Sequence, residues 1–245
     1  MAYQQMAYLY DQFMSEAPYD KWIDFTENII EDSQVSRIAD LGCGTGEIAV
    51  RLAERGYQMT GVDYSADMLT YADSKANEKN LSITWLHQDL RELEGLANLD
   101  LAVSFCDVIN YITNKDELED VFQQIFAILK PGGLFIFDVH SIYQVEHHFK
   151  NQTFADVLDH MSYIWFCIEG EEVGEMFHDL TFFAQEGDKY IRFDEFHHQR
   201  TYSIEFYHQL LFEAGFNNIK VYADFSLENL VHKDSERIFF VAEKA

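Results

Sequence analysis

The chain has 245 residues, 48% of them hydrophobic and only two of them prolines, which is the composition of a globular protein with a sizeable core. Its 43 acidic residues against 17 lysines and arginines give a formal net charge of −26, which disfavours binding to nucleic acids and to anionic membranes. The sequence contains no run of about 18 apolar residues, no signal peptide and only three widely spaced cysteines, so we expect a cytoplasmic protein with reduced thiols and no membrane-spanning helix.

Hydrophobic periodicity and turn signals predict alternating helices and strands over the first 140 residues. The predicted helices are 19–32, 46–56, 65–80 and 116–133, and the predicted strands are 36–41, 57–63, 81–86, 99–105 and 133–139. Ser65 is expected to cap the third helix, and Pro131 with the two following glycines is expected to end the fourth. Such alternation predicts a parallel sheet that is covered by helices on both faces.

Residues 141–200 lack this alternation. Their aromatic and β-branched runs break at Gly170 and at Gly187, which predicts the hairpins of an antiparallel sheet. The α/β pattern then resumes with a helix at 203–215 and strands at 216–225 and 237–245. We therefore expect an α/β core formed by residues 1–140 and 201–245, with a mostly parallel seven-stranded sheet. An antiparallel lid at 141–200 would be inserted after strand five and would contact the substrate.

A glycine-rich loop follows the first predicted strand, where residues 39–46 read ADLGCGTG. Glycine has no Cβ, so this loop can adopt positive φ angles or let a ligand approach its backbone. Ligands of open α/β sheets bind beyond the carboxyl ends of the strands. The loop, Asp63, Asp89, residues 105–111 and His140 follow the five strands in turn, and we expect them to line one edge of the sheet.

Two cofactor classes fit this pattern. Gly44-x-Gly46-x-x-Ala49 followed by Asp63 matches the dinucleotide fingerprint, which is typical of sites for a nicotinamide or flavin cofactor. The longer stretch Asp40-x-Gly42-x-Gly44-x-Gly46 instead resembles motif I of class I S-adenosylmethionine-dependent methyltransferases. The stretches GVDYS, QDL and LKPGG resemble later motifs of that family, and the last strands resemble its antiparallel seventh strand. This resemblance covers about residues 35–140 and 203–245.

The resemblance implies a Rossmann-like fold, S-adenosylmethionine as cofactor and S-adenosylhomocysteine as product. In that family Asp63 would hold the ribose hydroxyls and Asp89 would accept from the adenine amine. The residues that we expect to bind the cofactor are Tyr10, Asp40, Gly42, Cys43, Gly44, Gly46, Asp63, Tyr64, Met68, Asp89, Leu90 and Phe105. Other roles stay open, since Asp89 could be a helix cap and Met68 or Phe105 could be core. Cys43 is expected to contribute its backbone and not a nucleophilic thiol.

Asp107, Tyr111 and His140 are expected to face the substrate, and His140 or Asp107 could remove a proton from a hydroxyl or ammonium acceptor. We expect direct in-line methyl transfer to a small molecule. Methylation of tRNA or protein, a non-catalytic S-adenosylmethionine-binding protein and a nicotinamide oxidoreductase remain alternatives. The adjacent pairs His147-His148 and His197-His198 do not have chelating spacing, so no metal is expected. The oligomeric state stays open, with a homodimer as one outcome.

Overall fold

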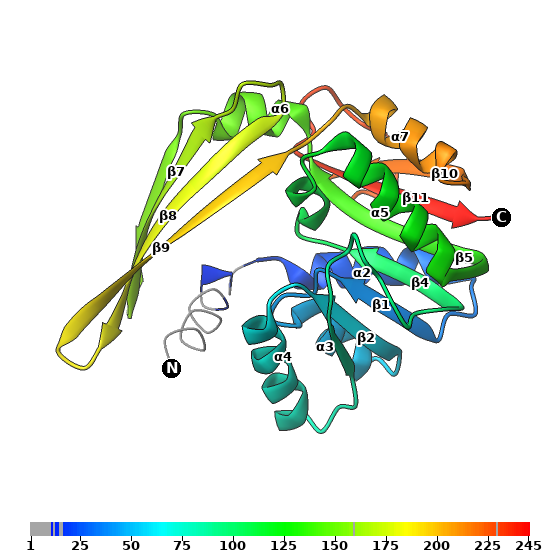
Figure 1. Cartoon of the computed structure of the whole chain (residues 1–245), viewed down its shortest axis with the longest axis horizontal. Helices are drawn as coiled ribbons and strands as arrows, with labels where there is room; N and C mark the ends of the chain where they lie inside the picture. The colour runs from blue at the N-terminus through cyan, green and yellow to red at the C-terminus, as the bar shows by residue number, and fades with distance from the viewer. Residues whose placement is uncertain (1–10, 12, 15–16, 159, 229) are drawn as a thin grey trace.

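The computed structural model describes residues 11, 13–14, 17–158, 160–228 and 230–245. Its core is a seven-stranded sheet in the order β10-β11-β5-β4-β1-β2-β3 (Figure 1). The strands are β1 Arg37–Leu41, β2 Gln58–Asp63, β3 Thr84–His87, β4 Leu99–Ser104, β5 Leu129–His140, β10 Phe216–Ala223 and β11 Arg237–Lys244. β1 to β5 run parallel, whereas β11 is antiparallel to both of its neighbours. The predicted sheet, including its antiparallel final strand, is confirmed.

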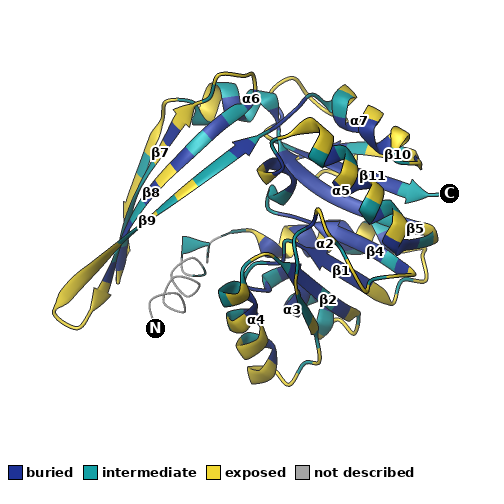
Figure 2. Ribbon diagram, viewed as in Figure 1, coloured by how far each residue is buried: buried dark blue, intermediate teal, exposed yellow. Residues whose placement is uncertain are grey.

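Helices cover both faces of this sheet, and the strands between them are buried (Figure 2). The helices are α2 Tyr19–Ile30, α3 Glu47–Glu54, α4 Ala66–Glu78, α5 Lys115–Ile128 and α7 Ile204–Glu213, with a 3₁₀ turn η1 at Val108–Tyr111. Trp22 of α2 and Leu52 of α3 belong to the apolar cluster on one face, and Phe122 of α5 and Tyr207 of α7 belong to the cluster on the other. Ser65 caps α4 as predicted, because its Oγ accepts from the Met68 N–H at 3.3 Å.

The boundary between α5 and β5 differs from the prediction. The helix ends at Ile128, and the strand starts at Leu129 and includes Pro131 and both following glycines. Pairing of Leu129 with Leu99 of β4 extends the strand over these residues. A Cβ at Gly133 would lie 2.9 Å from the Lys130 carbonyl oxygen and 3.0 Å from that of Leu99, so glycine permits this close approach. Gly133 therefore allows the strand to pair closely here, whereas the local signals predict only the end of a helix.

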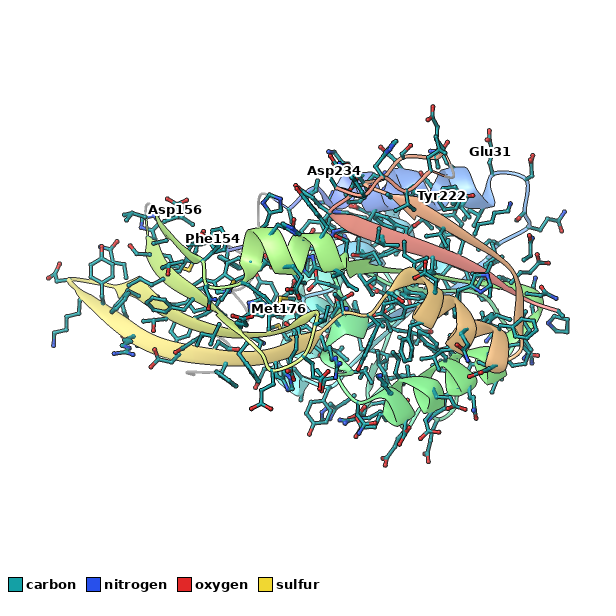
Figure 3. All side chains as sticks on the ribbon, turned by 90° about the horizontal axis from the view of Figure 1, so that it is seen from above. Glu31, Phe154, Asp156, Met176, Tyr222 and Asp234 are labelled. Atoms are coloured by element: carbon teal, nitrogen blue, oxygen red, sulfur yellow. The ribbon has the colours of Figure 1, made fainter. Side chains whose placement is uncertain are left out.

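Residues 141–200 form a second, antiparallel sheet, as predicted. Its order is β6-β7-β8-β9, with β6 Thr153–Val157, β7 Met161–Glu169, β8 Glu175–Glu186 and β9 Lys189–Arg200. It follows a short helical stretch, α6 Ile142–Gln144 and the π-helix η2 Val145–Phe149. Figure 3, seen from above, shows this sheet projecting from the core, with Asp156 and Phe154 on its projecting part. We call the face that carries Trp165, His178 and Gln199 the inner face, since these side chains contact one another and the core.

A short N-terminal segment links the glycine loop to the inserted sheet. Oδ1 of Asp11 accepts from Thr45 of the loop at 2.8 Å and from Lys75 of α4 at 2.7 Å. The Phe13 ring packs edge-on against Tyr163 of β7 at a centroid distance of 4.8 Å. This segment therefore connects the inner face of the inserted sheet to the loop on which cofactor binding is predicted. Within the described ranges, no helix has the length and apolar character that crossing a membrane requires.

Candidate functional site

The three glycines of the loop all adopt positive φ angles, but for different reasons. A Cβ at Gly42 would lie 2.4 Å from the Val108 side chain, and one at Gly46 would lie 2.9 Å from Trp85. Packing thus accounts for two of the glycines. A Cβ at Gly44 would meet nothing within 4 Å, although its φ is +51°. The backbone at Gly44 therefore borders open space, as a loop shaped around a ligand would.

We expect Gly44→Ala to weaken cofactor binding by about tenfold or more, because a methyl group would stand where the ligand approaches the backbone. The left-handed backbone should cost the variant only about 1–2 kcal/mol of folding free energy. Calorimetric titration with S-adenosylmethionine and chemical denaturation measure the two effects separately. Gly56→Ala is the matched control, since Gly56 also has a positive φ and open space but lies at the end of α3. Equal cofactor affinity in the two variants would contradict a ligand-shaped role for Gly44.

Two carboxylates stand beside this loop, Asp40 buried and Asp63 partly buried. Oδ2 of Asp63 accepts from the Gly44 N–H at 2.8 Å, and its Oδ1 accepts from the Ser65 N–H at 2.8 Å. Burial raises the pKa of Asp63, although these hydrogen bonds oppose the shift. Asp40 is 2% exposed, and burial together with the neighbouring Asp63 raises its pKa to about 7. Oδ2 of Asp40 has no hydrogen-bond partner in the described part of the chain.

These residues fit the cofactor that the sequence motifs imply. S-adenosylmethionine carries a positive sulfonium and an ammonium group, and a buried carboxylate with an unpartnered oxygen lacks a cation or a donor. The bare backbone at Gly44 supplies room, and Asp63 shapes the loop from the end of β2. Asp40 would therefore favour a cationic ligand, and Asp63 would present its remaining acceptor capacity to hydroxyl groups.

The raised pKa of Asp40 makes a stability prediction. The unfolded chain ionises this carboxyl near its ordinary value of 3.8, whereas the folded chain does so at about 7. The free energy of unfolding therefore falls as the pH rises from about 4 to about 7, and the full loss persists above pH 7. Asp40→Asn removes this effect, so its free energy of unfolding relative to wild type should rise by about 2 kcal/mol between pH 5 and pH 8. Denaturant titration of both cofactor-free proteins at the two pH values measures this; a pH-independent difference would contradict it.

The other predicted cofactor residues lie at varied depths. Cys43 is buried, and burial raises the pKa of its thiol, so it is not a thiolate. Leu90 is also buried, whereas Tyr64 is 75% exposed. Phe105 is 3% exposed and belongs to the same apolar cluster as Trp22, so packing accounts for it.

Two further predicted residues already have partners, and one cannot be placed. Asp89 accepts from the Arg91 guanidinium at 2.6 and 2.9 Å, which lowers its pKa, and it retains acceptor capacity toward an adenine amine. The backbone N–H of Met68 donates to Ser65 at the start of α4. Tyr10 lies outside the described residues.

A second polar cluster lies where the inner face of the inserted sheet meets the ends of β4 and β5. Nε2 of His140 lies 3.2 Å from Oδ1 of Asp107, and Nη2 of Arg237 lies at 3.2 Å from the same oxygen. Gln199 of β9 donates to Oδ2 of Asp107 at 2.9 Å. The pKa of Asp107 is well below its usual range: burial opposes the shift, but His140 and Arg237 outweigh it. The structure thus joins two of the three predicted substrate-facing residues as a carboxylate–imidazole pair.

A buried carboxylate, Asp138 of β5, holds the turn that carries Asp107. Cys106 and Asp107 both have positive φ, at 58° and 54°. Oδ1 of Asp138 accepts from the Cys106 N–H at 2.9 Å and from Trp22 Nε1 at 3.1 Å, and its Oδ2 contacts Arg237. These contacts stabilise a strained backbone, and strain of this kind concentrates at functional sites.

The remaining groups near this cluster differ in exposure. Tyr111 is 45% exposed, and its hydroxyl lies 3.4 Å from Nδ1 of His197. The surrounding protein, and then the Asp107 and Glu195 carboxylates, raise the pKa of this phenol. Asn110 is fully buried; its Oδ1 accepts from the His140 N–H at 3.0 Å. Asn110 therefore fixes the backbone of His140.

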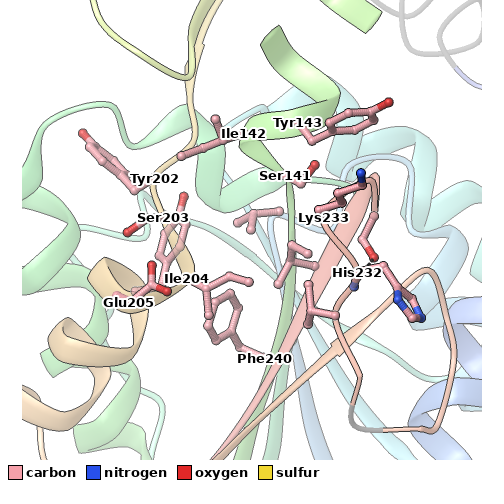
Figure 4. Close-up of a pocket in the computed structure, with 15 residues that line it drawn as sticks. Ser141, Ile142, Tyr143, Tyr202, Ser203, Ile204, Glu205, His232, Lys233 and Phe240 are labelled. Atoms are coloured by element: carbon pink, nitrogen blue, oxygen red, sulfur yellow. Dashed lines mark hydrogen bonds between the residues drawn. The ribbon is translucent and has the colours of Figure 1, made fainter. Parts of the chain in front are cut away.

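A small apolar cavity of about 190 Å³ lies elsewhere, between the starts of α6 and α7 (Figure 4). Ser141, Tyr202 and His232 are among its lining residues, and it includes no member of the Asp107–His140 pair. Among the residues that the structure describes, no group of three or more His, Cys, Asp or Glu side chains is arranged to hold a metal ion.

Sequence analysis missed Arg237, Asp138 and Gln199. Asp138 sits in an apolar strand two residues before His140, and this buried acid was the available local signal. Arg237 faces His140 across the antiparallel pair β11–β5, which requires knowledge of strand register. Gln199 reaches Asp107 from 92 residues away in the chain, so no local pattern identifies it.

Comparison with known proteins gives four findings. A methyltransferase-domain family model matches residues 38–133, which excludes the inserted sheet. A candidate methyltransferase of Geobacillus sp. strain WCH70 is 43% identical over the whole of both chains. The crystal structure of an S-adenosylmethionine-dependent methyltransferase from Clostridium acetobutylicum covers both whole chains at 29% identity with a TM-score of 0.90. S-adenosylmethionine-bound CalS10, an amino pentose methyltransferase from Micromonospora echinaspora, shares the fold at 15% identity and a TM-score of 0.77, over 97% of this chain and 96% of its own.

Proposed function

Because the chain belongs to the class I S-adenosylmethionine-dependent methyltransferases, we propose that it transfers the methyl group to a small molecule bound between the core and the inserted sheet. Its cofactor is S-adenosylmethionine, which supplies a methyl group on a sulfonium and leaves as S-adenosylhomocysteine. We place the cofactor on Asp40, the loop backbone at Gly44 and Asp63. The observation that carries this placement is the open space at the Gly44 backbone, beside the buried Asp40 and the partly buried Asp63.

His140 is proposed to take the proton that the acceptor loses. Its Nε2 faces Asp107, and its Nδ1 has no hydrogen-bond partner among the described residues. Since ionised Asp107 only accepts hydrogen bonds, it keeps the proton of neutral His140 on Nε2 and leaves the Nδ1 lone pair free. The acceptor's proton moves to Nδ1 while its nucleophilic atom bonds the methyl group. Asp107 then stabilises the imidazolium that forms.

A small acceptor is supported by charge and by the lining of the inner face. The net charge of −26 opposes approach of a polyanion such as tRNA. The rings of Phe149, Trp165 and Phe154 pack together beside His140, with the Phe149 ring centroid 4.9 Å from that of the imidazole. Such an aromatic wall next to a few convergent polar groups is typical of small-molecule sites. The name of CalS10 also specifies a small acceptor, an amino pentose. We propose that residues 141–200 form the lid and acceptor wall of this site.

The test is the fate of the methyl group. The enzyme is incubated with methyl-labelled S-adenosylmethionine and, separately, with a metabolite extract, total tRNA and total protein of one bacterial culture. The proposal is supported if the label appears in a low-molecular-weight product. This product should be absent when Gly44→Ala replaces the wild type at limiting cofactor concentration. Label on tRNA or on protein would replace it with the macromolecular alternative. Cofactor binding without transfer to any fraction would favour a non-catalytic S-adenosylmethionine-binding protein.

A further inference from the structure

A continuous chain of hydrogen bonds crosses the inner face of the inserted sheet and ends at Asp107. Trp165 Nε1 donates to Nδ1 of His178 at 2.9 Å. Nε2 of His178 lies 3.0 Å from Oε1 of Gln199. Gln199 Nε2 then donates to Oδ2 of Asp107 at 2.9 Å, and the other oxygen of Asp107 faces His140. Three neighbouring strands of the insertion are thereby linked to the carboxyl ends of β4 and β5.

The direction of these bonds is determined by their two ends. Ionised Asp107 can only accept, so the amide of Gln199 must turn its nitrogen to Asp107 and its oxygen to His178. The indole of Trp165 can only donate, so Nδ1 of His178 must accept and its Nε2 must carry the proton. These two ends therefore determine the orientation of Gln199 and the tautomer of His178. The Cys167 thiol, whose Sγ lies 3.4 Å from the same Nδ1, can only share that acceptor as a second donor.

The centre of this chain of hydrogen bonds is buried and uncharged. His178 is 5% exposed and Gln199 is 3% exposed, and burial lowers the pKa of His178 to about 4. His178 is therefore neutral at physiological pH and does not act as a second base beside His140. A buried polar network whose members are all satisfied specifies one geometry strongly, because an unpaired member would cost a full desolvation penalty.

Resting on the function proposed above, we propose that Gln199 and His178 are positioning residues that orient the Asp107 carboxylate toward His140. Gln199 occupies Oδ2, which leaves Oδ1 to His140 and Arg237. Without this donor, the carboxylate is free to turn both oxygens toward Arg237 and to leave the imidazole. His140 then loses the contact that keeps its proton on Nε2. Correct docking of the inserted sheet thus completes the base, since the donor comes from the insertion.

The test reads the imidazole protons directly and needs no acceptor. In protein with ¹⁵N-labelled histidines, wild type should show hydrogen-bonded Nε2 protons for both His140 and His178, assigned with His140→Gln and His178→Gln. Gln199→Leu should lose the His140 Nε2 proton signal to solvent exchange while retaining cofactor affinity. Gln185→Leu is the matched control, because Gln185 is an exposed amide of the same sheet that bonds Gly187 and His160. It should leave both signals unchanged.

Each other outcome has a defined meaning. A His140 signal that is unchanged in Gln199→Leu would overturn the proposal. A lower melting temperature of that variant would not rescue it, because a Gln199 that only stabilises the fold would also lower the melting temperature. Should Gln199→Leu fail to fold, Gln199→Met replaces it, because its thioether has a similar length, carries no donor and should also abolish the His140 signal. With an acceptor identified, Gln199→Leu should lower kcat by about tenfold or more without changing cofactor Kd. Absence of methyl transfer by wild type would refute the proposed function but not the spectroscopic result.

Discussion

Asp63→Ala should raise the Kd for S-adenosylmethionine by about 100-fold. The carboxylate accepts from the Gly44 N–H at 2.8 Å and from the Ser65 N–H at 2.8 Å, so its removal leaves one donor of the loop and one at the start of α4 without their partner. It also removes the acceptor that we assign to the ribose hydroxyls. Hydrogen bonds to charged groups are worth about 1.5–3 kcal/mol each, and a loss of about 3 kcal/mol corresponds to this change in affinity. Calorimetric titration with S-adenosylmethionine and S-adenosylhomocysteine measures it.

The matched control is Asp73→Ala on the exposed face of α4. It removes the same charge from the same region, and its carboxylate accepts from Asn77 within the helix. We expect its Kd to stay within twofold of wild type. If both variants lost affinity equally, the effect would belong to net charge. Unchanged affinity in a folded Asp63→Ala protein would remove Asp63 from the proposed cofactor site.

His140→Gln should lower kcat by about 10²–10⁴-fold, which is the usual contribution of a general base, while cofactor affinity stays constant. Glutamine retains a donor toward Asp107, whose Oδ1 lies 3.2 Å from Nε2 of His140, so the fold of the cluster should survive. The loss would then be confined to proton removal. Single-turnover transfer to the acceptor identified by the labelling experiment gives the rate.

His208→Gln provides the comparison, because His208 is exposed on α7. Its rate should match that of wild type. A rate within about threefold of wild type in His140→Gln would show that the acceptor loses its proton without His140, and the proposed catalytic pair would be abandoned. The proposed small-molecule acceptor would survive that result, since the two rest on different observations.

Local patterns in the sequence predicted the parts of this protein that depend on neighbouring residues. The alternation of helices and strands, the glycine loop and the N-cap at Ser65 each result from spacing within a few residues. Asp40, Asp63 and His140 were identifiable because each lies at the carboxyl end of a strand, and parallel strands bring these ends to one edge. The family resemblance rests on the same short stretches.

The start of β5 shows where local signals mislead. Pro131 and the glycines after it predict the end of a helix, yet the strand already begins at Leu129 because it pairs with Leu99 of β4. Gly133 is needed where the backbones approach closely, which only the assembled sheet reveals. Tertiary pairing therefore ended the helix at Ile128, before the local stop signal at Pro131 is reached.

The surroundings of His140, the proposed base, depend on tertiary structure. Arg237, Gln199 and Asp107 lie up to 130 residues apart in sequence, and they meet because β11 pairs with β5 and the inserted sheet folds back onto the core. Hydrogen bonds and ion pairs act over a few ångströms, so separations of this size leave no periodic trace in the chain. The sequence alone determined the fold class and the cofactor loop, whose motif lies within residues 39–46. Which side chains surround His140 depended on strand register and on the docking of the insertion, and those are properties of the folded molecule.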